Sequence, residues 1–204
     1  MRKIFIISAP SGAGKTSLVR EVCKNLSFIR PAVSFTTRKI RDSEIDTKDY
    51  FFIDKDKFAD KINKKEFLEH QTVYGNLYGT TLDSISTISE QGLDVILEID
   101  YKGMLAVKEV IPEAISIYII PPSIEILRSR LKNRDEDTES VIETRMESSL
   151  KELEYAKYAD FTLINDNFNL ALNSLIGIIL FKKTPEKYVK SYIHDLISLN
   201  KLIV

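Results

Sequence analysis

Cysteine is nearly absent from the chain, with one residue, Cys23, among 204. A single cysteine excludes a disulfide within the chain, and without a disulfide framework nothing in the composition indicates secretion. Cys23 lies in a predicted helix at residues 17–26, so we expect it to pack as a small apolar side chain rather than to react.

The sequence also lacks long hydrophobic runs and a charge excess of either sign. Its longest apolar stretches, residues 114–122 and 175–181, are well short of the ~20 residues that a membrane-spanning helix needs, and residues 1–8 are too short for a signal peptide. The chain carries 29 basic and 30 acidic side chains, a formal net charge of −1. We therefore expect a cytoplasmic protein that binds neither membrane nor nucleic acid.

What the sequence does contain is an alternation of apolar strands and helices. This alternation is typical of an α/β fold with a parallel sheet that is covered on both faces. Pro121 and Pro122 end one strand, and Ser123 is placed to cap the helix that follows. The strand-like runs are residues 3–8, 93–99, 114–120 and 161–164, and the helix-like patterns are residues 17–26, 83–91, 102–110, 123–131 and 139–157.

Three segments depart from this alternation. Residues 34–79 are polar, dotted with Tyr and Phe, and too long for a simple connection, which predicts an inserted lobe of short strands and a helix. Residues 133–140 are strongly charged and predict a loop of the kind that forms lids. Residues 184–204 begin with Thr-Pro-Glu and predict a terminal helix that docks on the core or, alternatively, binds a partner.

Residues 9–16, Ala-Pro-Ser-Gly-Ala-Gly-Lys-Thr, lie between the first predicted strand and the first predicted helix. This context is the one that a phosphate-binding P-loop requires. Gly12 and Gly14 would let successive backbone N–H groups turn toward a phosphate, and the helix N-terminus would add its own N–H groups. Lys15 would supply a positive charge for the β- and γ-phosphates, and the Thr16 hydroxyl can ligate Mg²⁺.

The loop departs from the usual motif at its first position, where Ala9 replaces glycine. The inner glycines nearest the phosphates are kept, so we expect little loss. A glycine-rich turn that merely joins a strand to a helix is the alternative, and the pair Lys15-Thr16 after Gly14 argues against it.

Further motifs follow the P-loop in order along the chain. They are Ser-Phe-Thr-Thr-Arg-Lys-Ile-Arg from Ser34, Asp-Tyr-Phe-Phe from Asp49, Phe-Leu-Glu-His from Phe67, Tyr-Gly-Asn-Leu-Tyr-Gly-Thr from Tyr74, Leu-Glu-Ile-Asp from Leu97, Arg-Leu-Lys-Asn-Arg from Arg130, then Arg145 and Asn165-Asp166. In this combination, from the first strand to about residue 183, the chain resembles the guanylate kinase family.

The resemblance implies a P-loop NTPase fold with a parallel sheet core, an inserted GMP-binding lobe and a lid. The implied core comprises residues 1–33, 81–124 and 150–204, the lobe residues 34–80, and the lid residues 125–149. The implied activity transfers the γ-phosphoryl group of ATP to GMP, or also to dGMP, with Mg²⁺, in a monomer or homodimer.

The resemblance places the donor ATP on the P-loop and on the lid. Lys15, Arg41, Arg134 and Arg145 are the implied catalytic residues, which would stabilise charge on the transferring group. Surface arginines paired with nearby acids are the alternative for the lid positions. The implied ATP-binding residues are Ala9, Pro10, Ser11, Gly12, Ala13, Gly14, Lys15, Thr16, Arg130, Arg134, Asn165 and Asp166.

The resemblance places the acceptor GMP on the inserted lobe. Guanidinium groups suit its dianionic phosphate, and phenol hydroxyls add donors without further charge. Glu69 is the implied reader of guanine, because a carboxylate can accept from both N1–H and the 2-amino group, whereas adenine offers an acceptor at N1. An exposed acid is the alternative for Glu69. The implied GMP-binding residues are Ser34, Arg38, Arg41, Tyr50, Glu69, Tyr78, Thr80 and Asp100.

Two further acids and one histidine lie near these motifs. Asp100 ends the strand at residues 93–99, and the resemblance places it against GMP and, with Thr16, on the water shell of Mg²⁺; a cap for the next helix is the alternative. Glu98 stands two residues earlier on the same strand face, where it could also contact metal-bound water. We expect no catalytic role for His70, because the acceptor oxygen is already ionised.

Two rival functions remain open on the sequence. A kinase for AMP or dTMP would share the fold, and Glu69 with Thr80 argues against it because those nucleotides present different edges. A catalytically inactive binding module of guanylate-kinase-like fold is the other rival. Such modules typically lose P-loop or phosphate-site residues, whereas this chain keeps Lys15, Arg38 and Arg41.

Overall fold

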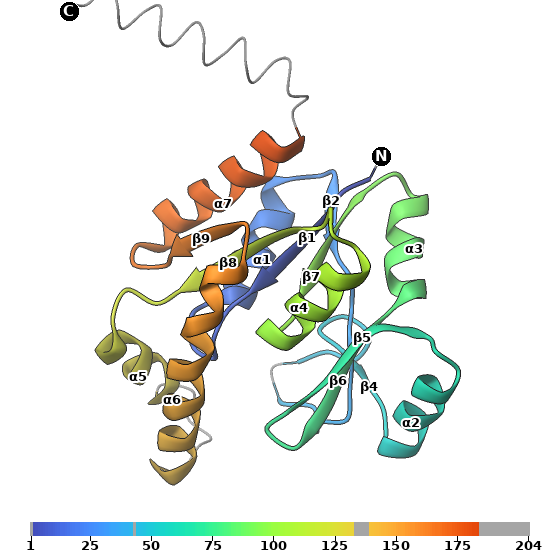
Figure 1. Ribbon diagram of the computed structural model, residues 1–204, viewed down its shortest axis with the longest axis horizontal. Helices are drawn as coiled ribbons and strands as arrows, with labels where there is room; N and C mark the ends of the chain where they lie inside the picture. Colours follow the sequence, from blue (N-terminus) through green and yellow to red (C-terminus); the bar gives the residue numbers. More distant parts are fainter. Residues whose placement is uncertain (1, 43, 133–138, 184–204) are drawn as a thin grey trace, which may run out of the picture.

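The computed structural model describes residues 2–42, 44–132 and 139–183, and its centre is a five-stranded sheet in the order β2-β7-β1-β8-β9 (Figure 1). All of its strand pairs are parallel. The α/β class and the parallel sheet expected from the sequence are therefore confirmed. The strands are β1 (Ile4–Ser8), β2 (Ile29–Pro31), β7 (Asp94–Glu98), β8 (Ile115–Ile120) and β9 (Phe161–Ile164).

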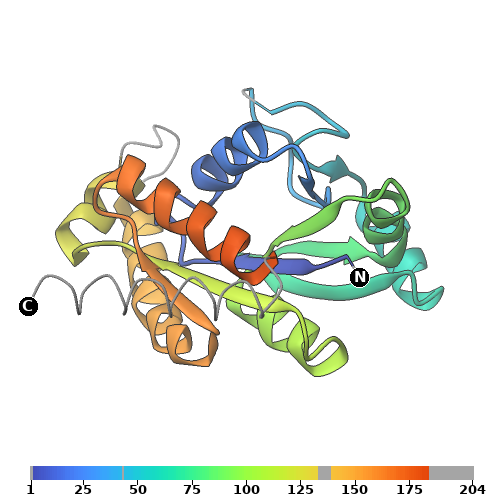
Figure 2. The same ribbon diagram turned by 90° about the horizontal axis from the view of Figure 1, so that it is seen from above.

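Helices cover both faces of this sheet because alternate strand residues point to opposite sides. Phe5 and Ile7 of β1 pack with α1 (Lys15–Asn25) and α7 (Phe168–Lys183). Ile6, between them, packs with α3 (Leu82–Glu90) and α4 (Tyr101–Val110). Figure 2 shows α1 and α7 on one side of β1 and α4 on the other. The expected alternation of buried strands and covering helices accounts for this core.

A second sheet lies beside the first and has four strands in the order β4-β3-β6-β5. Its strands are β3 (Phe35–Thr36), β4 (Phe51–Phe52), β5 (Phe67–Val73) and β6 (Asn76–Thr81). The helix α2 (Lys55–Asn63) is capped by Asp54, whose carboxylate accepts from the Lys57 amide at 2.7 Å, and it buries Phe58. The long polar segment thus forms short strands and a helix, as its composition predicts.

Beyond β8 the chain forms α5 (Ile124–Lys132) and α6 (Glu139–Leu153), which lie across from the second sheet in Figure 1. The Ser123 hydroxyl accepts from the Ile126 amide at 3.2 Å, so the predicted cap is confirmed. The single helix expected at residues 139–157 is wrong at its end, because the α-helix stops at Leu153 and a 3-10 helix, η1 (Glu154–Tyr158), follows.

Two elements were not expected from the sequence: the short edge strand β2 and the helix α7. Of the charged loop predicted at residues 133–140, residues 133–138 lie outside the described residues, whereas the last two residues belong to α6 and are helical. The predicted helix at residues 184–204 also lies outside the described residues. Within the described part of the chain, no helix is long and apolar enough to cross a membrane.

Candidate active site

The P-loop connects β1 to α1 at the carboxyl end of the central strand. Gly12 and Gly14 have φ angles of 87° and 91°, in the left-handed region that residues with a side chain rarely adopt. Gly14 is also the N-cap of α1, and no side chain caps that helix end. The first N–H groups of α1 therefore face the loop without a side-chain acceptor, which is the arrangement that suits a bound phosphate.

The structure explains why alanine is tolerated at the first position of the loop. Ala9 is 6% exposed and packs in the hydrophobic core beside β1. Among the described residues, only Thr47, Lys65 and Tyr74 combine a side chain with a positive φ, so Ala9 has an ordinary backbone conformation. A glycine is therefore not required there.

Lys15 and Thr16 both reach the end of β7, the strand next to β1. The Lys15 Nζ donates to the Ile99 carbonyl oxygen at 2.9 Å. The Thr16 hydroxyl donates to a carboxylate oxygen of Glu98. Glu98 thus lies against the hydroxyl that the sequence assigned to Mg²⁺.

The side chain of Asn165 holds the P-loop through a hydrogen bond to its backbone. Its side chain is 3% exposed, and its Nδ2 donates to the Ala13 carbonyl at 2.8 Å. A Cβ at Gly14 would come within 2.4 Å of that Nδ2, so glycine is needed for this close approach as well as for its φ. Asp166, the next residue, is exposed.

Arg130, on α5, contacts Asn165 beside the P-loop. Its Nη2 donates to the Asn165 carbonyl oxygen at 2.9 Å. Its Nη1 is buried and has no hydrogen-bond partner, and the same is true of the Asn165 Oδ1. Buried polar atoms are normally satisfied, so this corner has unused capacity for polar contacts.

Arg38 lies at the centre of a cluster of aromatic and charged groups in the second sheet. Its Nε donates to the Tyr78 hydroxyl at 3.1 Å, and its guanidinium lies 5.6 Å from the centre of the Tyr50 ring. Its two terminal nitrogens form a bidentate pair with Glu44, at 2.9 and 2.6 Å. The structure thus brings together three residues that the sequence assigned to the phosphate of GMP.

Glu44 also holds the turn that carries Arg41. Its Oε2 accepts from the Arg41 amide at 3.0 Å, and its Oε1 lies 4.0 Å from the Arg41 Nη1. Burial alone would raise the pKa of Glu44, but the hydrogen bond from Arg38 and the bond from the Arg41 amide bring that pKa below its ordinary value. Glu44 therefore stays ionised and fixes both arginines.

Glu69 lies on β5 and is 6% exposed, so it is not the exposed acid considered from the sequence. The pairing of β5 with β6 shifts register between Phe67 and Glu69, which sets Glu69 opposite Thr80. Its Oε1 accepts from the Thr80 amide at 3.1 Å and from the Thr80 hydroxyl at 2.9 Å. The Ser34 hydroxyl lies 2.9 Å from that of Thr80, so the three proposed guanine-side residues form one hydrogen-bonded group.

The second oxygen of Glu69 lies against the helix α4. A Cβ at Gly103 would lie 2.8 Å from the Oε2, so glycine at this position on α4 makes room for the carboxylate. Burial raises the pKa of Glu69 to about 7; bonds from Thr80 oppose this shift and the charge of Asp100 adds to it. Asp100 accepts from the Gly103 amide at 2.8 Å, and therefore caps α4 while standing close to Glu69.

Of the arginines assigned to the lid, Arg134 lies outside the described residues. Arg145 lies on α6, and its guanidinium is 5.7 Å from the centre of the Tyr74 ring, at the tip of the β5–β6 hairpin. His70, on the same strand as Glu69, is exposed and contacts the rings of Phe58 and Phe67.

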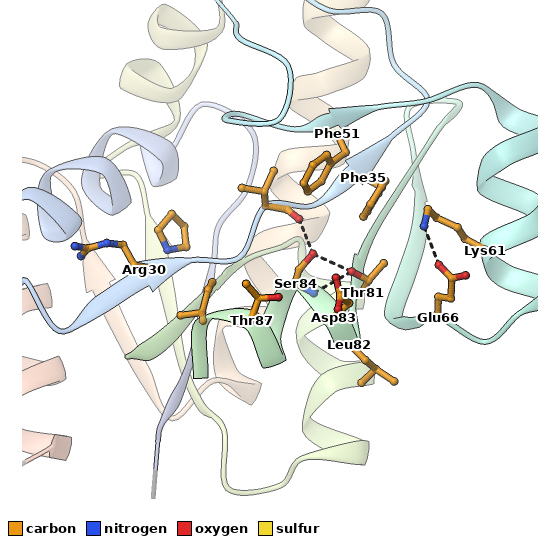
Figure 3. Close-up of a pocket in the computed structure, with 13 residues that line it drawn as sticks. Arg30, Phe35, Phe51, Lys61, Glu66, Thr81, Leu82, Asp83, Ser84 and Thr87 are labelled. Atoms are coloured by element: carbon orange, nitrogen blue, oxygen red, sulfur yellow. Dashed lines mark hydrogen bonds and ion pairs between the residues drawn. The ribbon is translucent and has the colours of Figure 1, made fainter. Parts of the chain in front are cut away.

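A groove of about 780 Å³ lies on the other side of the strands that carry these residues (Figure 3). Val33, Phe35 and Thr81 line it, whereas their neighbours Ser34 and Thr80 belong to the Glu69 group. Because side chains alternate along a strand, the groove and the Glu69 group lie on opposite faces. None of the residues assigned to ATP or GMP lines this groove.

Sequence reasoning missed Glu44, Gly103 and Tyr74 as parts of this site. Glu44 carried a usable signal, since it is the acid nearest in sequence to two arginines expected to bind phosphate. Tyr74 begins one of the quoted motifs, but nothing in that motif indicates its contact with Arg145. Gly103 carried no sequence signal, because its role arises from a contact between segments far apart in the chain.

A P-loop at the centre of a parallel sheet thus faces a second sheet with an Arg–Tyr cluster and a buried carboxylate. This fold and this arrangement define a nucleoside monophosphate kinase of the P-loop class. The residues that the sequence assigned to ATP and those that it assigned to GMP meet at the carboxyl end of β7, where Glu98 contacts Thr16 and Asp100 lies near Glu69.

Comparison with known proteins identifies the family within this class. The family model described as guanylate kinase matches residues 1–181. Guanylate kinases from Coxiella burnetii and Psychrobacter arcticus are 43% and 42% identical to the chain, covering 95% and 92% of it and 96% and 93% of their own lengths. The crystal structure of guanylate kinase from Anaplasma phagocytophilum matches with a TM-score of 0.76 at 26% identity, covering 91% of this chain and 88% of that one. The chain belongs to the guanylate kinase family, and it uses ATP to phosphorylate GMP.

Proposed function

We propose that the P-loop binds ATP, that the second sheet binds GMP, and that the γ-phosphoryl group passes in line between them. The observation that carries this proposal is the position of residues 98–100. Lys15 donates to Ile99, and the carboxylate of Asp100 stands near that of Glu69. A single strand end therefore contacts the P-loop and lies near the base-reading group, so the two nucleotides would be held with their phosphates toward one another.

On the donor side, Lys15 and the N–H groups of the P-loop would neutralise the β- and γ-phosphates. The first-turn N–H groups of α1 have no side-chain cap and are available for this contact. The buried Nη1 of Arg130 would complete the same corner by donating to a phosphate or ribose oxygen of ATP. Arg134 and Arg145 would approach the transferring group from the lid.

On the acceptor side, Arg38, Arg41, Tyr50 and Tyr78 would hold the phosphate of GMP. The guanidinium of Arg38 is preset by Glu44, so less conformational freedom is lost when the phosphate binds. The acceptor oxygen is already ionised and needs no general base, so positioning and charge stabilisation supply most of the rate enhancement.

The residues at the end of β7 suit Mg²⁺, which prefers oxygen ligands and keeps several waters when bound with nucleotide phosphates. Thr16 offers a hydroxyl, and Glu98 and Asp100 offer carboxylates within reach of a water shell. In the described part of the chain, no group of three or more His, Cys, Asp or Glu side chains could hold a metal by itself. Bound Mg²⁺ would therefore come with the nucleotide and would neutralise phosphate charge.

We also propose the division into a core, a GMP-binding lobe at residues 34–80 and a lid at residues 125–149, which would close around the two nucleotides and exclude water. The expected monomer or homodimer and the expected cytoplasmic location stay predictions.

The proposal is tested by measuring ADP formation from Mg·ATP with GMP, dGMP, AMP, dTMP or no acceptor. We expect turnover that depends on GMP. Turnover that prefers AMP or dTMP would leave a kinase but overturn the role of Glu69. Binding of GMP without turnover would favour the inactive binding module.

A further inference from the structure

The tip of the β5–β6 hairpin carries a tyrosine, Tyr74, in a left-handed backbone conformation that tyrosine rarely adopts. Val73 pairs with Asn76, so the turn has two residues, Tyr74 and Gly75. Their φ angles are 48° and 77°, both positive. Turns of this kind strongly favour Asn, Asp or Gly at the first position, because a bulky side chain is strained at positive φ. An aromatic residue is therefore a costly choice here.

The Tyr74 side chain does not compensate by entering the core. It is 43% exposed. Its ring instead lies 5.7 Å from the guanidinium of Arg145, a residue of α6. Partial burial raises the pKa of the Tyr74 phenol, while an interaction with the Ser148 hydroxyl, three residues further along α6, opposes that shift. The hairpin tip thus contacts one face of α6 through a strained tyrosine.

The strands behind this tip carry the residues assigned to GMP. Glu69 lies on β5, and Tyr78 and Thr80 lie on β6. Hydrogen-bonded pairing runs without interruption from Glu69 opposite Thr80 to the tip. A displacement of these residues on GMP binding would therefore move the tip, and with it the ring against Arg145.

We propose that Tyr74 is a positioning residue that links acceptor binding to the lid, by holding the Arg145 guanidinium where it meets the transferring phosphoryl group. This inference rests on the role proposed above for Arg145. Attraction between a cation and an aromatic face suits the task, since it fixes the guanidinium without occupying its N–H donors.

The turn conformation allows a sharp test, because replacement of Tyr74 by Asn should affect stability and kcat in opposite ways. Asn is favoured at this turn position, so Tyr74→Asn should keep or raise the melting temperature. Loss of the ring should lower kcat by about 3- to 10-fold, the range expected from a cation–aromatic contact, with little change in KM for GMP. Tyr74→Phe keeps the ring and should recover most of the lost kcat.

Tyr158 provides a matched control on the described surface. It is 55% exposed, and the Nζ of Lys157 lies 5.2 Å from the centre of its ring. It belongs to η1, and it is not one of the residues assigned to ATP or GMP. Tyr158→Asn should leave kcat unchanged. An unchanged kcat in Tyr74→Asn, or a loss that Phe does not recover, would overturn the inference.

A double-mutant cycle separates this inference from the proposed role of Arg145. Arg145→Ala should lower kcat strongly, and in that background Tyr74→Asn should have less than about a twofold further effect. A full additional loss would show that Tyr74 acts on something other than Arg145. An Arg145→Ala variant with normal kcat would instead refute the role of Arg145 itself, and the inference with it.

Discussion

The replacement of Glu69 by Gln tests base recognition at the level of single atoms. In the native protein Oε1 accepts from the amide and hydroxyl of Thr80, while Oε2 lies beside Gly103. The glutamine side chain of Glu69→Gln would keep its one oxygen on the two Thr80 donors. Its NH₂ group would then face guanine N1–H and the 2-amino group, so donors would oppose donors.

The expected magnitude follows from the hydrogen bonds lost. A bond to a charged group contributes about 1.5–3 kcal/mol, and an unpaired buried donor costs about 1–3 kcal/mol. These contributions overlap, so we expect a loss of about 3–4 kcal/mol in transition-state stabilisation, or roughly 10²- to 10³-fold in kcat/KM for GMP. Adenine presents an acceptor at N1, which the new NH₂ group can satisfy, so kcat/KM for AMP should not fall.

The assay compares initial rates of ADP formation with varied GMP or AMP at saturating Mg·ATP. Glu66→Gln is the matched control, because Glu66 lies in the same lobe and pairs with Lys61 at 2.7 Å but belongs to no proposed site. Thermal unfolding would verify the fold, and Glu69→Gln should be at least as stable as the native protein since it removes a buried charge. A loss below tenfold for GMP, or an equal loss for AMP, would refute base reading by Glu69.

The same contacts support three further predictions. The pKa of Glu69 is raised from 4.5 to about 7 in the folded state, so the folded state binds one more proton than the unfolded state between these pH values. The free energy of unfolding without nucleotide should therefore fall as pH rises from 4.5 to 7. Chemical denaturation of Glu69→Gln should show a smaller dependence on pH over this range. Lys15→Ala should nearly abolish turnover in the ADP assay with an unchanged circular dichroism spectrum; near-native activity would contradict the P-loop assignment. Glu44→Gln should raise KM for GMP by about 5- to 30-fold, because Arg38 loses its bidentate partner, and an unchanged KM would show that Arg38 needs no preset geometry.

The central sheet was predictable because its signals are local. The runs that became β1, β7 and β8 are apolar and bounded by turn residues, as strands buried on both faces should be. The edge strand β9 was found from a shorter apolar run, although only Leu163 of it is buried. The strand β2 was missed because three residues ending in Pro31 carry no periodicity. The helix α7 was missed because Phe168–Lys183 is apolar around most of its circumference, so its sequence shows no polar face.

The site was predictable where a motif carries the chemistry within a short segment. Lys15 and Thr16 follow their glycines directly, and Arg38, Tyr78 and Glu69 stand within recognisable family motifs. The shift in strand pairing that sets Glu69 against Thr80 has no such signal. It depends on the tertiary pairing of β5 with β6, which residue spacing alone does not specify.

Positive φ alone does not single out Tyr74, since Thr47 and Lys65 share it. Both of those residues are exposed, and Lys65 directly follows the C-cap of α2, a position where the left-handed conformation is common. Tyr74 differs because its strain accompanies a contact with another segment, that between its ring and Arg145. The buried carboxylate of Glu69 is a comparable exception on the same hairpin, and it too faces a different segment, at Gly103. Local rules are broken twice on one hairpin, each time toward a neighbouring element, which is the pattern expected where function rather than folding selects the residue.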